Sequence, residues 1–170
     1  MIRHAKPDDL TSILEIYNEA ILNTTAVYDY KPHTMEERTA WYEKKVSDGF
    51  PVLVFAENNV VVGFAAFGPF RIWSAYKYTI EHSIYVQKSH RGKHIGTALL
   101  KELLKIANAQ GYATMVAGID ASNEGSRIMH EKLGFSYSGT LQRVGYKFGK
   151  WLDLSLYQYQ LQGPETPIEE

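Results

Sequence analysis

The sequence predicts a single α/β (α+β) domain with a mixed central sheet and the element order β-α-α-β-β-β-α-β-α-β-β. Three observations lead to this fold class. A length of 170 residues suits one domain. The run Thr79–Val86 is rich in β-branched and aromatic residues, and a short basic loop connects it to a segment with apolar residues at helical spacing. Strand-like runs and helical segments also alternate through much of the chain.

The N-terminal part predicts a short strand and two helices. The strand covers residues 2–5, and Pro7 with the two aspartates after it marks the start of a helix over 8–22. Residues 23–30 are polar and aromatic without a helical period, which favours an ordered loop. Such a loop is either a surface connection or a wall of a substrate site. A Thr-x-x-Glu capping box then opens a second helix over 34–47.

The rest of the chain alternates strands and helices. The remaining predicted elements are strands at 52–56, 60–67, 79–86, 113–119, 135–146 and 151–161, and helices beginning at Gly96 and at about Glu124. The first two of these strands form an antiparallel hairpin. We predict one domain over residues 1–162, followed by a disordered tail over 163–170 that contains two prolines and three glutamates.

The basic loop from Lys88 to His94 is the strongest candidate for a binding site. A helix that starts directly after a strand presents unpaired backbone N–H groups, and the helix dipole adds positive potential there. This arrangement predicts an anion site, most often for a phosphate. The simpler alternative is a solvated basic turn. The loop contains neither a P-loop motif nor the G-x-G-x-x-G fingerprint of dinucleotide-binding proteins.

Composition excludes several classes of function. A net charge of −1 gives no field that would attract nucleic acid or an anionic membrane. The chain has no cysteine, so it has no disulfide, thiolate nucleophile or thiolate metal ligand. Its six histidines show no metal-binding spacing, so we expect no metal. Without an apolar run of signal-peptide or membrane-spanning length, we expect a cytoplasmic protein.

Glu81 is the candidate for chemistry within the central strand. On a regular strand it shares one face with Thr79, Ser83 and Tyr85. Polar side chains on one face of a central strand pack poorly in an apolar core, so this face is better suited to lining a cavity. The alternative is a carboxylate at the end of a sheet that is paired with Lys77 or an arginine.

Several motifs together resemble the GCN5-related N-acetyltransferases (GNAT). They are the order of elements, the R-x-x-x-x-G loop, and the downstream segment A-S-N-E-G-S-R-I-M-H-E-K-L-G-F. E-I-Y-N-E-A-I, T-I-E-H-S-I-Y-V and V-G-Y-K-F-G-K-W-L-D-L are similar to the phosphinothricin and methionine-sulfoximine acetyltransferases within that family. The resemblance extends from Ile2 to about Leu161. It implies a mostly antiparallel GNAT-type sheet flanked by helices.

The resemblance implies acetyl-CoA as co-substrate. The loop would cradle its pyrophosphate, and the strand before the loop would run beside its pantetheine arm and offer an N–H to the thioester carbonyl. The residues implied are Ile84, Tyr85, Val86, Arg91, Gly92, Lys93, His94, Ile95, Gly96, Thr97 and Asn123. His94 stands where the family loop usually has glycine, so a positive φ is harder to adopt and we expect binding with altered affinity. Asn123 could also be only a helix cap.

For catalysis, the resemblance assigns the general base to Glu81. An α-amino group has a pKa of about 8 and is mostly protonated at neutral pH, so a carboxylate that takes its proton creates the nucleophile. His130 stands where many relatives carry a tyrosine that protonates the departing CoA thiolate. The alternative for His130 is an ordinary polar residue on a helix.

The candidate acceptor-binding residues are Arg71, Lys77 and Tyr28. An arginine can bind the carboxylate of an amino-acid-like amine through two hydrogen bonds, whereas a solvated cation is the alternative for Lys77. We expect direct acetyl transfer to the amino group of a small amino-acid-like molecule, and the resemblance implies that this molecule is of the methionine sulfoximine, methionine sulfone or phosphinothricin type. The rival functions are acetylation of protein N-termini or polyamines, and non-catalytic binding of acyl-CoA. The resemblance also implies a homodimer through the C-terminal strands, whose aromatic residues Trp151, Tyr157 and Tyr159 are candidates for the interface or for the core.

Overall fold

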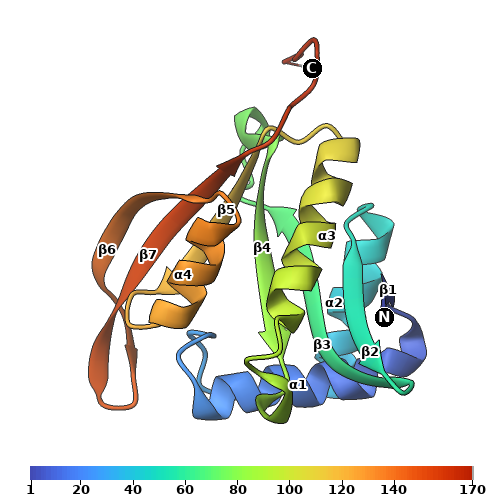
Figure 1. Ribbon diagram of the computed structural model, residues 1–170, viewed down its shortest axis with the longest axis vertical. Helices are drawn as coiled ribbons and strands as arrows, with labels where there is room; N and C mark the ends of the chain where they lie inside the picture. Colours follow the sequence, from blue (N-terminus) through green and yellow to red (C-terminus); the bar gives the residue numbers. More distant parts are fainter. Residues whose placement is uncertain (170) are drawn as a thin grey trace. The chain divides into compact units, whose positions relative to one another are not determined.

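The computed structural model describes residues Met1–Glu169 and contains the predicted mixed sheet (Figure 1). Within this part of the chain, seven strands form the order β1-β2-β3-β4-β5-β7-β6. The strands are β1 (Ile2–His4), β2 (Val52–Glu57), β3 (Val60–Pro69), β4 (Thr79–Val86), β5 (Thr114–Asp120), β6 (Ser136–Lys147) and β7 (Lys150–Gln160). The helices are α1 (Leu10–Asn23), α2 (Met35–Ser47), α3 (Ile95–Ala109) and α4 (Glu124–Lys132). The predicted element order is confirmed.

The chain divides into two compact units. The first unit comprises residues 1–67 and 83–103, and the second comprises residues 68–82 and those from Leu104 onward. The boundary passes through β4 between His82 and Ser83. The predicted phosphate loop therefore belongs to the first unit, whereas Glu81 and His130 belong to the second.

In the first unit, β1, β2 and β3 are antiparallel neighbours that pack against α1 and α2. β3 is buried at every position between its ends, so it reads as a continuous apolar run rather than an alternating one. Ile13 and Phe64 have no exposed surface. Burying one side chain of this kind stabilises a fold by about 1.5–3 kcal/mol. The Thr-x-x-Glu capping box at the start of α2 is present as predicted.

Gly63 on β3 allows two other elements of the first unit to approach closely. A Cβ atom at this position would lie 3.1 Å from Cγ2 of Ile95 and 3.3 Å from the carbonyl oxygen of Tyr85. The backbone oxygen of Tyr85 has little freedom to move, since β4 is held to β3 by the bond from the Gln87 amide to the Val62 carbonyl. Because glycine has no side chain, Ile95 at the start of α3 can pack closely against β3 at Gly63.

In the second unit, β5, β7 and β6 are antiparallel, and β6 and β7 form a long hairpin (Figure 1). The first residues of β4 pair in parallel with β5, from Thr79 opposite Thr114 to Glu81 opposite Val116. His82 is the next residue along β4. Register shifts in β6 accompany Gly139 at φ 152° and Arg143 at φ 54°, as expected where bulges bend a strand.

After Gln160 the described chain has no further helix or strand, but it is held by hydrogen bonds. The Gly163 amide donates to the Tyr112 carbonyl, and the Ile168 amide donates to the Tyr78 hydroxyl. Disorder of the tail stays a prediction, and Glu170 lies outside the described residues. No helix in residues 1–169 has both the length and the apolar character needed to cross a membrane.

Asp9 anchors β1 to the start of α1. Its carboxylate accepts two hydrogen bonds from Arg3, at 2.6 and 2.9 Å, and one from the Lys6 amide at 2.8 Å. The pKa of Asp9 lies below its usual value of 3.8, and the hydrogen bonds from Arg3 are the largest cause of this shift. A lowered carboxyl pKa contributes stability above the unfolded-state value, and that stability is lost as the pH falls through the folded-state value.

We predict that Asp9→Asn lowers the free energy of unfolding by about 1–3 kcal/mol at neutral pH, because it breaks a partly buried charge-assisted pair. The difference from the parent should be smaller at a pH well below 3.8, where Asp9 of the parent, whose pKa is lowered, takes up its proton. Urea unfolding at both pH values measures it. The exposed neighbour Asp8, changed to Asn, is the control and should have little effect. A difference that stays constant with pH would contradict this account.

Candidate active site

The predicted phosphate loop lies between β4 and α3 and bends sharply twice. Gly92 has φ 78° and His94 has φ 60°. His94 therefore adopts the left-handed conformation that its glycine-like position requires, at a cost on the order of 1 kcal/mol for a residue with a Cβ atom. The Ala98 amide bonds to the His94 carbonyl. The amides of residues 95–97 thus precede the helical ladder, which is where a helix N-terminus can bind an anion.

Arg91 braces the loop from within the first unit. Its Nη2 lies 2.6 Å from the Glu19 carboxylate, and its Nε donates to the Val86 carbonyl at 3.1 Å. Both contacts fix where the chain leaves β4. Lys88 and Lys93 are exposed, as Arg91 is, but neither forms an ion pair within the described chain. These lysines rather than Arg91 therefore have the freedom to follow a ligand.

Ile84, Tyr85 and Val86 form the half-buried end of β4 in the first unit. The Tyr85 ring packs edge-on against Tyr17, with centroids 5.2 Å apart, and tilted against Phe64 at the same distance. These contacts hold the backbone of the segment that the family resemblance places beside the pantetheine arm.

Arg38 is a buried cation beside this aromatic cluster. Only 2% of its surface is exposed, and its guanidinium lies 3.9 Å from the centre of the Tyr17 ring and 4.5 Å from that of Trp41. Burial lowers the pKa of Arg38, and the nearby tyrosines oppose this effect only in part. No carboxylate within the described chain forms an ion pair with it directly.

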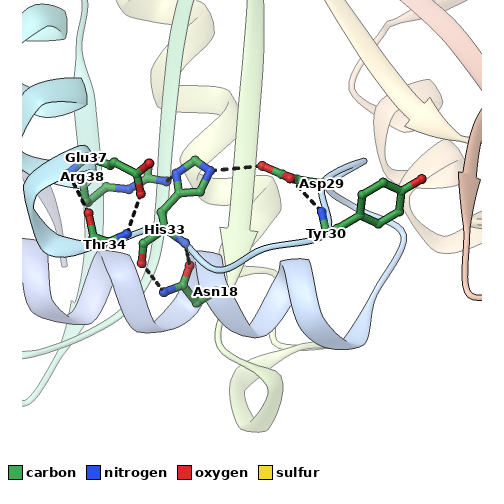
Figure 2. A network of polar contacts seen from close by, with 7 residues as sticks. All are labelled: Asn18, Asp29, Tyr30, His33, Thr34, Glu37 and Arg38. Atoms are coloured by element: carbon green, nitrogen blue, oxygen red, sulfur yellow. Dashed lines mark hydrogen bonds and ion pairs between the residues drawn. The ribbon is translucent and has the colours of Figure 1, made fainter.

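His33 joins Arg38 to Asp29 (Figure 2). Nη2 of Arg38 lies 3.3 Å from Nδ1 of His33, and Nε2 of His33 lies 3.2 Å from the Asp29 carboxylate. A guanidinium can only donate, so Nδ1 accepts and Nε2 carries the hydrogen that points to Asp29. Asn18 adds two bonds to the backbone of His33. The bridge thus fixes the end of the loop that carries Tyr28, a predicted acceptor-site residue.

In the second unit, Glu81 is a half-buried carboxylate on β4. Burial raises its pKa above the usual 4.5, and the positive charge of Arg71 partly offsets this. Among residues 1–169 it forms no ion pair, so the alternative of a pair with Lys77 is not observed. A Cβ atom on Gly118 would lie 3.3 Å from its Oε1. Glycine at that position leaves the carboxylate room on the β5 side.

Arg71 and Lys77 lie in the exposed segment that precedes β4 in the second unit. Arg71 donates to the Phe70 carbonyl at 2.9 Å and lies over the Phe70 ring. Lys77 lies 5.3 Å from the centre of the Tyr78 ring. Neither side chain is held by a carboxylate within the described chain.

His130 is buried and bonded to a second histidine that the motif analysis did not single out. Its Nε2 lies 3.0 Å from Nε2 of His82, and its Nδ1 lies 2.7 Å from the Ser126 carbonyl. The two ring planes differ by 8° with centroids 5.1 Å apart, so the rings meet edge to edge. Both nitrogens of His130 are therefore engaged within the protein. The one hint in the sequence is a histidine on the apolar face of β4.

Asn123 caps α4, with its Oδ1 accepting from the Ser126 amide at 3.1 Å. This is the structural alternative that the sequence left open; contact with CoA stays a prediction for this residue. Among the side chains the structure describes, no cluster of three or more His, Asp or Glu could hold a metal ion.

We predict that His33→Phe lowers stability by about 1–3 kcal/mol, since it leaves a buried guanidinium without its acceptor. The phenyl ring keeps the packing of His33 against Tyr17. Hydrogen exchange should increase in residues 24–34, and urea unfolding measures the free energy. His4→Phe, at an exposed position, is the control. Unchanged exchange in the loop would show that the bridge does not hold it.

Comparison with known proteins gives the family. The acetyltransferase (GNAT) family model matches residues 11–135. The L-methionine sulfoximine/L-methionine sulfone acetyltransferase of Salmonella typhimurium is 43% identical over 166 residues, covering 98% of this chain and 97% of that protein. An N-acetyltransferase structure from Staphylococcus aureus Mu50 has 59% identity and a TM-score of 0.94, covering 95% of this chain and 98% of that chain.

A phosphinothricin acetyltransferase structure from Sinorhizobium meliloti, in complex with acetyl-CoA, has 37% identity and a TM-score of 0.94, covering 98% of this chain and 91% of that chain. These similarities extend over nearly the whole chain and confirm the resemblance that the motifs predicted. The chain belongs to the acetyltransferase (GNAT) family and is an N-acetyltransferase.

Proposed function

We propose that the protein transfers the acetyl group of acetyl-CoA to the amino group of a small amino-acid-like acceptor, with Glu81 as general base. The acceptors are of the methionine sulfoximine, methionine sulfone or phosphinothricin type, as the names of the relatives suggest. The observation that carries this proposal is Glu81 itself, a half-buried carboxylate that has no ion-pair partner in the described chain and whose pKa is raised by burial.

The raised pKa suits the chemistry. An α-ammonium group with a pKa of about 8 must lose a proton before it can attack, and a base whose pKa lies closer to this value takes it more readily. The amine nitrogen then bonds to the thioester carbon, the C–S bond breaks, and the sulfur leaves as the thiolate. The nitrogen loses its second proton as the amide forms, and this proton balances the one that the thiolate takes up. A main-chain N–H of residues 84–86 would stabilise the negative charge on the thioester oxygen.

Acetyl-CoA would be held by the loop that opens α3. The amides of Ile95, Gly96 and Thr97 precede the helical ladder, and Lys93 is exposed beside them. This supports binding of the diphosphate by the whole predicted segment, residues 91–97. Arg91 would serve mainly as its brace, because its guanidinium is already bonded to Glu19 and Val86.

The acceptor would be recognised through its carboxylate. Arg71 is exposed, and its charge reaches the Glu81 carboxyl group within the same unit. Lys77 adds a second exposed cation, and Tyr28 lies in the loop that His33 holds. Two cations favour an anionic acceptor over a polyamine, which would need an acidic site. Acetylation of peptide N-termini is the remaining catalytic rival.

A screen of acetyl-CoA turnover separates these functions. We expect activity with methionine sulfone, methionine sulfoximine or phosphinothricin, and none with polyamines. Activity with peptides alone would contradict the proposed substrate class. Isothermal titration with CoA provides the separate measure of whether the loop binds its ligand.

We predict that Glu81→Gln lowers kcat by about 10²–10⁴-fold, the usual contribution of a general base. Binding of CoA should not change. The variant should be more stable than the parent at neutral pH, because burial disfavours the charged carboxylate and the amide has no charge to lose. In the parent, kcat/KM should rise with pH through a value above 4.5. Turnover equal to that of the parent would favour non-catalytic acyl-CoA binding instead.

We also propose that the protein is a homodimer through the β6–β7 hairpin. This hairpin leaves a set of large apolar side chains exposed: Leu141, Val144, Tyr146, Phe148 and Trp151. Tyr146 and Trp151 face each other across the strands with ring centroids 5.1 Å apart. Five large exposed apolar side chains on one hairpin are more typical of an interface than of a solvated face.

Trp151→Ser should therefore shift the protein from twice the 19.3 kDa chain mass toward the mass of one chain. Sedimentation equilibrium measures this. Trp73→Ser removes another exposed tryptophan outside the hairpin and is the matched control. A parent protein that sediments as a single chain would refute the dimer.

A further inference from the structure

The first unit contains a cavity that the proposed active site does not use. Its volume is about 660 Å³, and it lies between α1, the start of β3 and the residues that directly follow β4. Sites for small molecules typically have volumes of about 300–1,000 Å³. The residues that line this cavity include neither the proposed base and acceptor-binding residues nor the predicted phosphate-binding segment 91–97. The cavity is therefore a candidate site for a second ligand.

Three charged side chains line the cavity: Glu15, Glu19 and Lys88. Glu15 and Glu19 are four residues apart on α1, so they share one face of the helix. Glu19 is already matched, since Nη2 of Arg91 lies 2.6 Å from its carboxylate. Glu15 and Lys88 form no ion pair within residues 1–169, either with each other or with another side chain. The cavity wall thus offers one carboxylate and one ammonium group that are available to a ligand.

The lining also has an apolar part, formed by Ile16 and Val61. Both residues belong to the core of the first unit, and each has 5% of its surface exposed. On α1, Ser12 adds a hydroxyl group one turn before Glu15. Apolar surface beside a few polar and charged groups is the usual lining of a small-molecule site.

The two available charges select among ligands. A simple amine would pair with Glu15 and leave the ammonium group of Lys88 without a counter-charge, whereas a simple carboxylate would do the reverse. A zwitterion satisfies both groups, and charge complementarity of this kind gives specificity. An apolar side chain on the same ligand would be removed from water against Ile16 and Val61, which favours binding.

We propose that this cavity binds an amino-acid zwitterion with an apolar side chain, either as the free amino acid or as a short peptide. Its ammonium group bonds to Glu15 and its carboxylate bonds to Lys88, while its side chain packs against the apolar part of the lining. The ligand is held without a covalent step. This site is separate from the proposed acceptor site, so the two are tested independently.

L-Leucine is the first probe, and methyl NMR reports on the cavity itself because Val61 lines it. Leucine should shift the methyl signals of Val61, and the titration gives a Kd for this site. Isoamylamine lacks the carboxylate of leucine and isocaproate lacks its ammonium group, so each should bind about three- to tenfold more weakly. Binding of either analogue as tightly as leucine would overturn the zwitterion.

A dipeptide identifies the source of the ligand. Leucyl-leucine carries the same two charged groups farther apart, so the tighter of the two ligands shows whether the cavity suits a free amino acid or a peptide. Val61 signals that move with neither leucine nor leucyl-leucine would overturn the proposal. These titrations use the parent protein and need no variant.

Two variants test the charges, each with a matched control. Glu15→Gln and Lys88→Met should each raise the leucine Kd by about three- to tenfold. Glu43→Gln and Lys101→Met, at exposed positions that do not line the cavity, should not change it. Glu15→Gln should also remove most of the preference for leucine over isocaproate, because the ammonium group then loses its carboxylate partner. A preference that persists in this variant would contradict the assigned contact.

Leucine also resembles the proposed acceptors, so a variant of the acceptor site separates the two sites. Arg71→Ala should leave the Kd read from Val61 unchanged, whereas Glu15→Gln should leave turnover of acetyl-CoA with methionine sulfone unchanged. A Val61 shift that is lost in Arg71→Ala and kept in Glu15→Gln would overturn the second site. An absence of turnover in the parent would refute the proposed function and would leave the Val61 titration as the measure of this cavity.

Discussion

The strand β4 is the constraint on which the proposed active site depends. Side chains alternate along a strand, so adjacent residues must serve opposite faces. Glu81 approaches Gly118 of β5, and the next residue, His82, bonds to His130 of α4. Four residues after His82 the strand ends at Val86, whose carbonyl accepts a hydrogen bond from Arg91. One eight-residue segment thus holds a candidate base, one member of a histidine pair and the entry to the predicted phosphate loop.

Sequence reasoning reached the element order and the family because both rest on local signals. Apolar periodicity, the capping box of α2 and the strand-to-helix loop are each contained in a short window. In the loop between β4 and α3, a local argument also identified a backbone conformation. A positive φ at position 94 was recognised as the difficulty that histidine introduces, and the structure has φ 60° there. Histidine meets the requirement at some conformational cost rather than avoiding it.

The features that sequence reasoning missed depend on contacts between distant residues. His82 and His130 are 48 positions apart, so no spacing rule connects them. Arg38 lies on a helix of low overall hydrophobicity and resembles a surface residue, yet it is almost fully buried between two aromatic rings. Its charge is matched through His33 to Asp29, and such a relay becomes visible only when α1, the loop and α2 are in place.

The left-handed conformation of His94 also has a consequence for affinity. The bent shape of the predicted phosphate loop is part of the fold, with φ 60° at His94 and the amides of residues 95–97 ahead of the helical ladder. The conformational penalty is therefore borne when the chain folds, and the diphosphate proposed above would meet a preorganised site. Its binding would then lose less entropy to ordering of the loop, so a residue that weakens the fold would strengthen binding of the ligand.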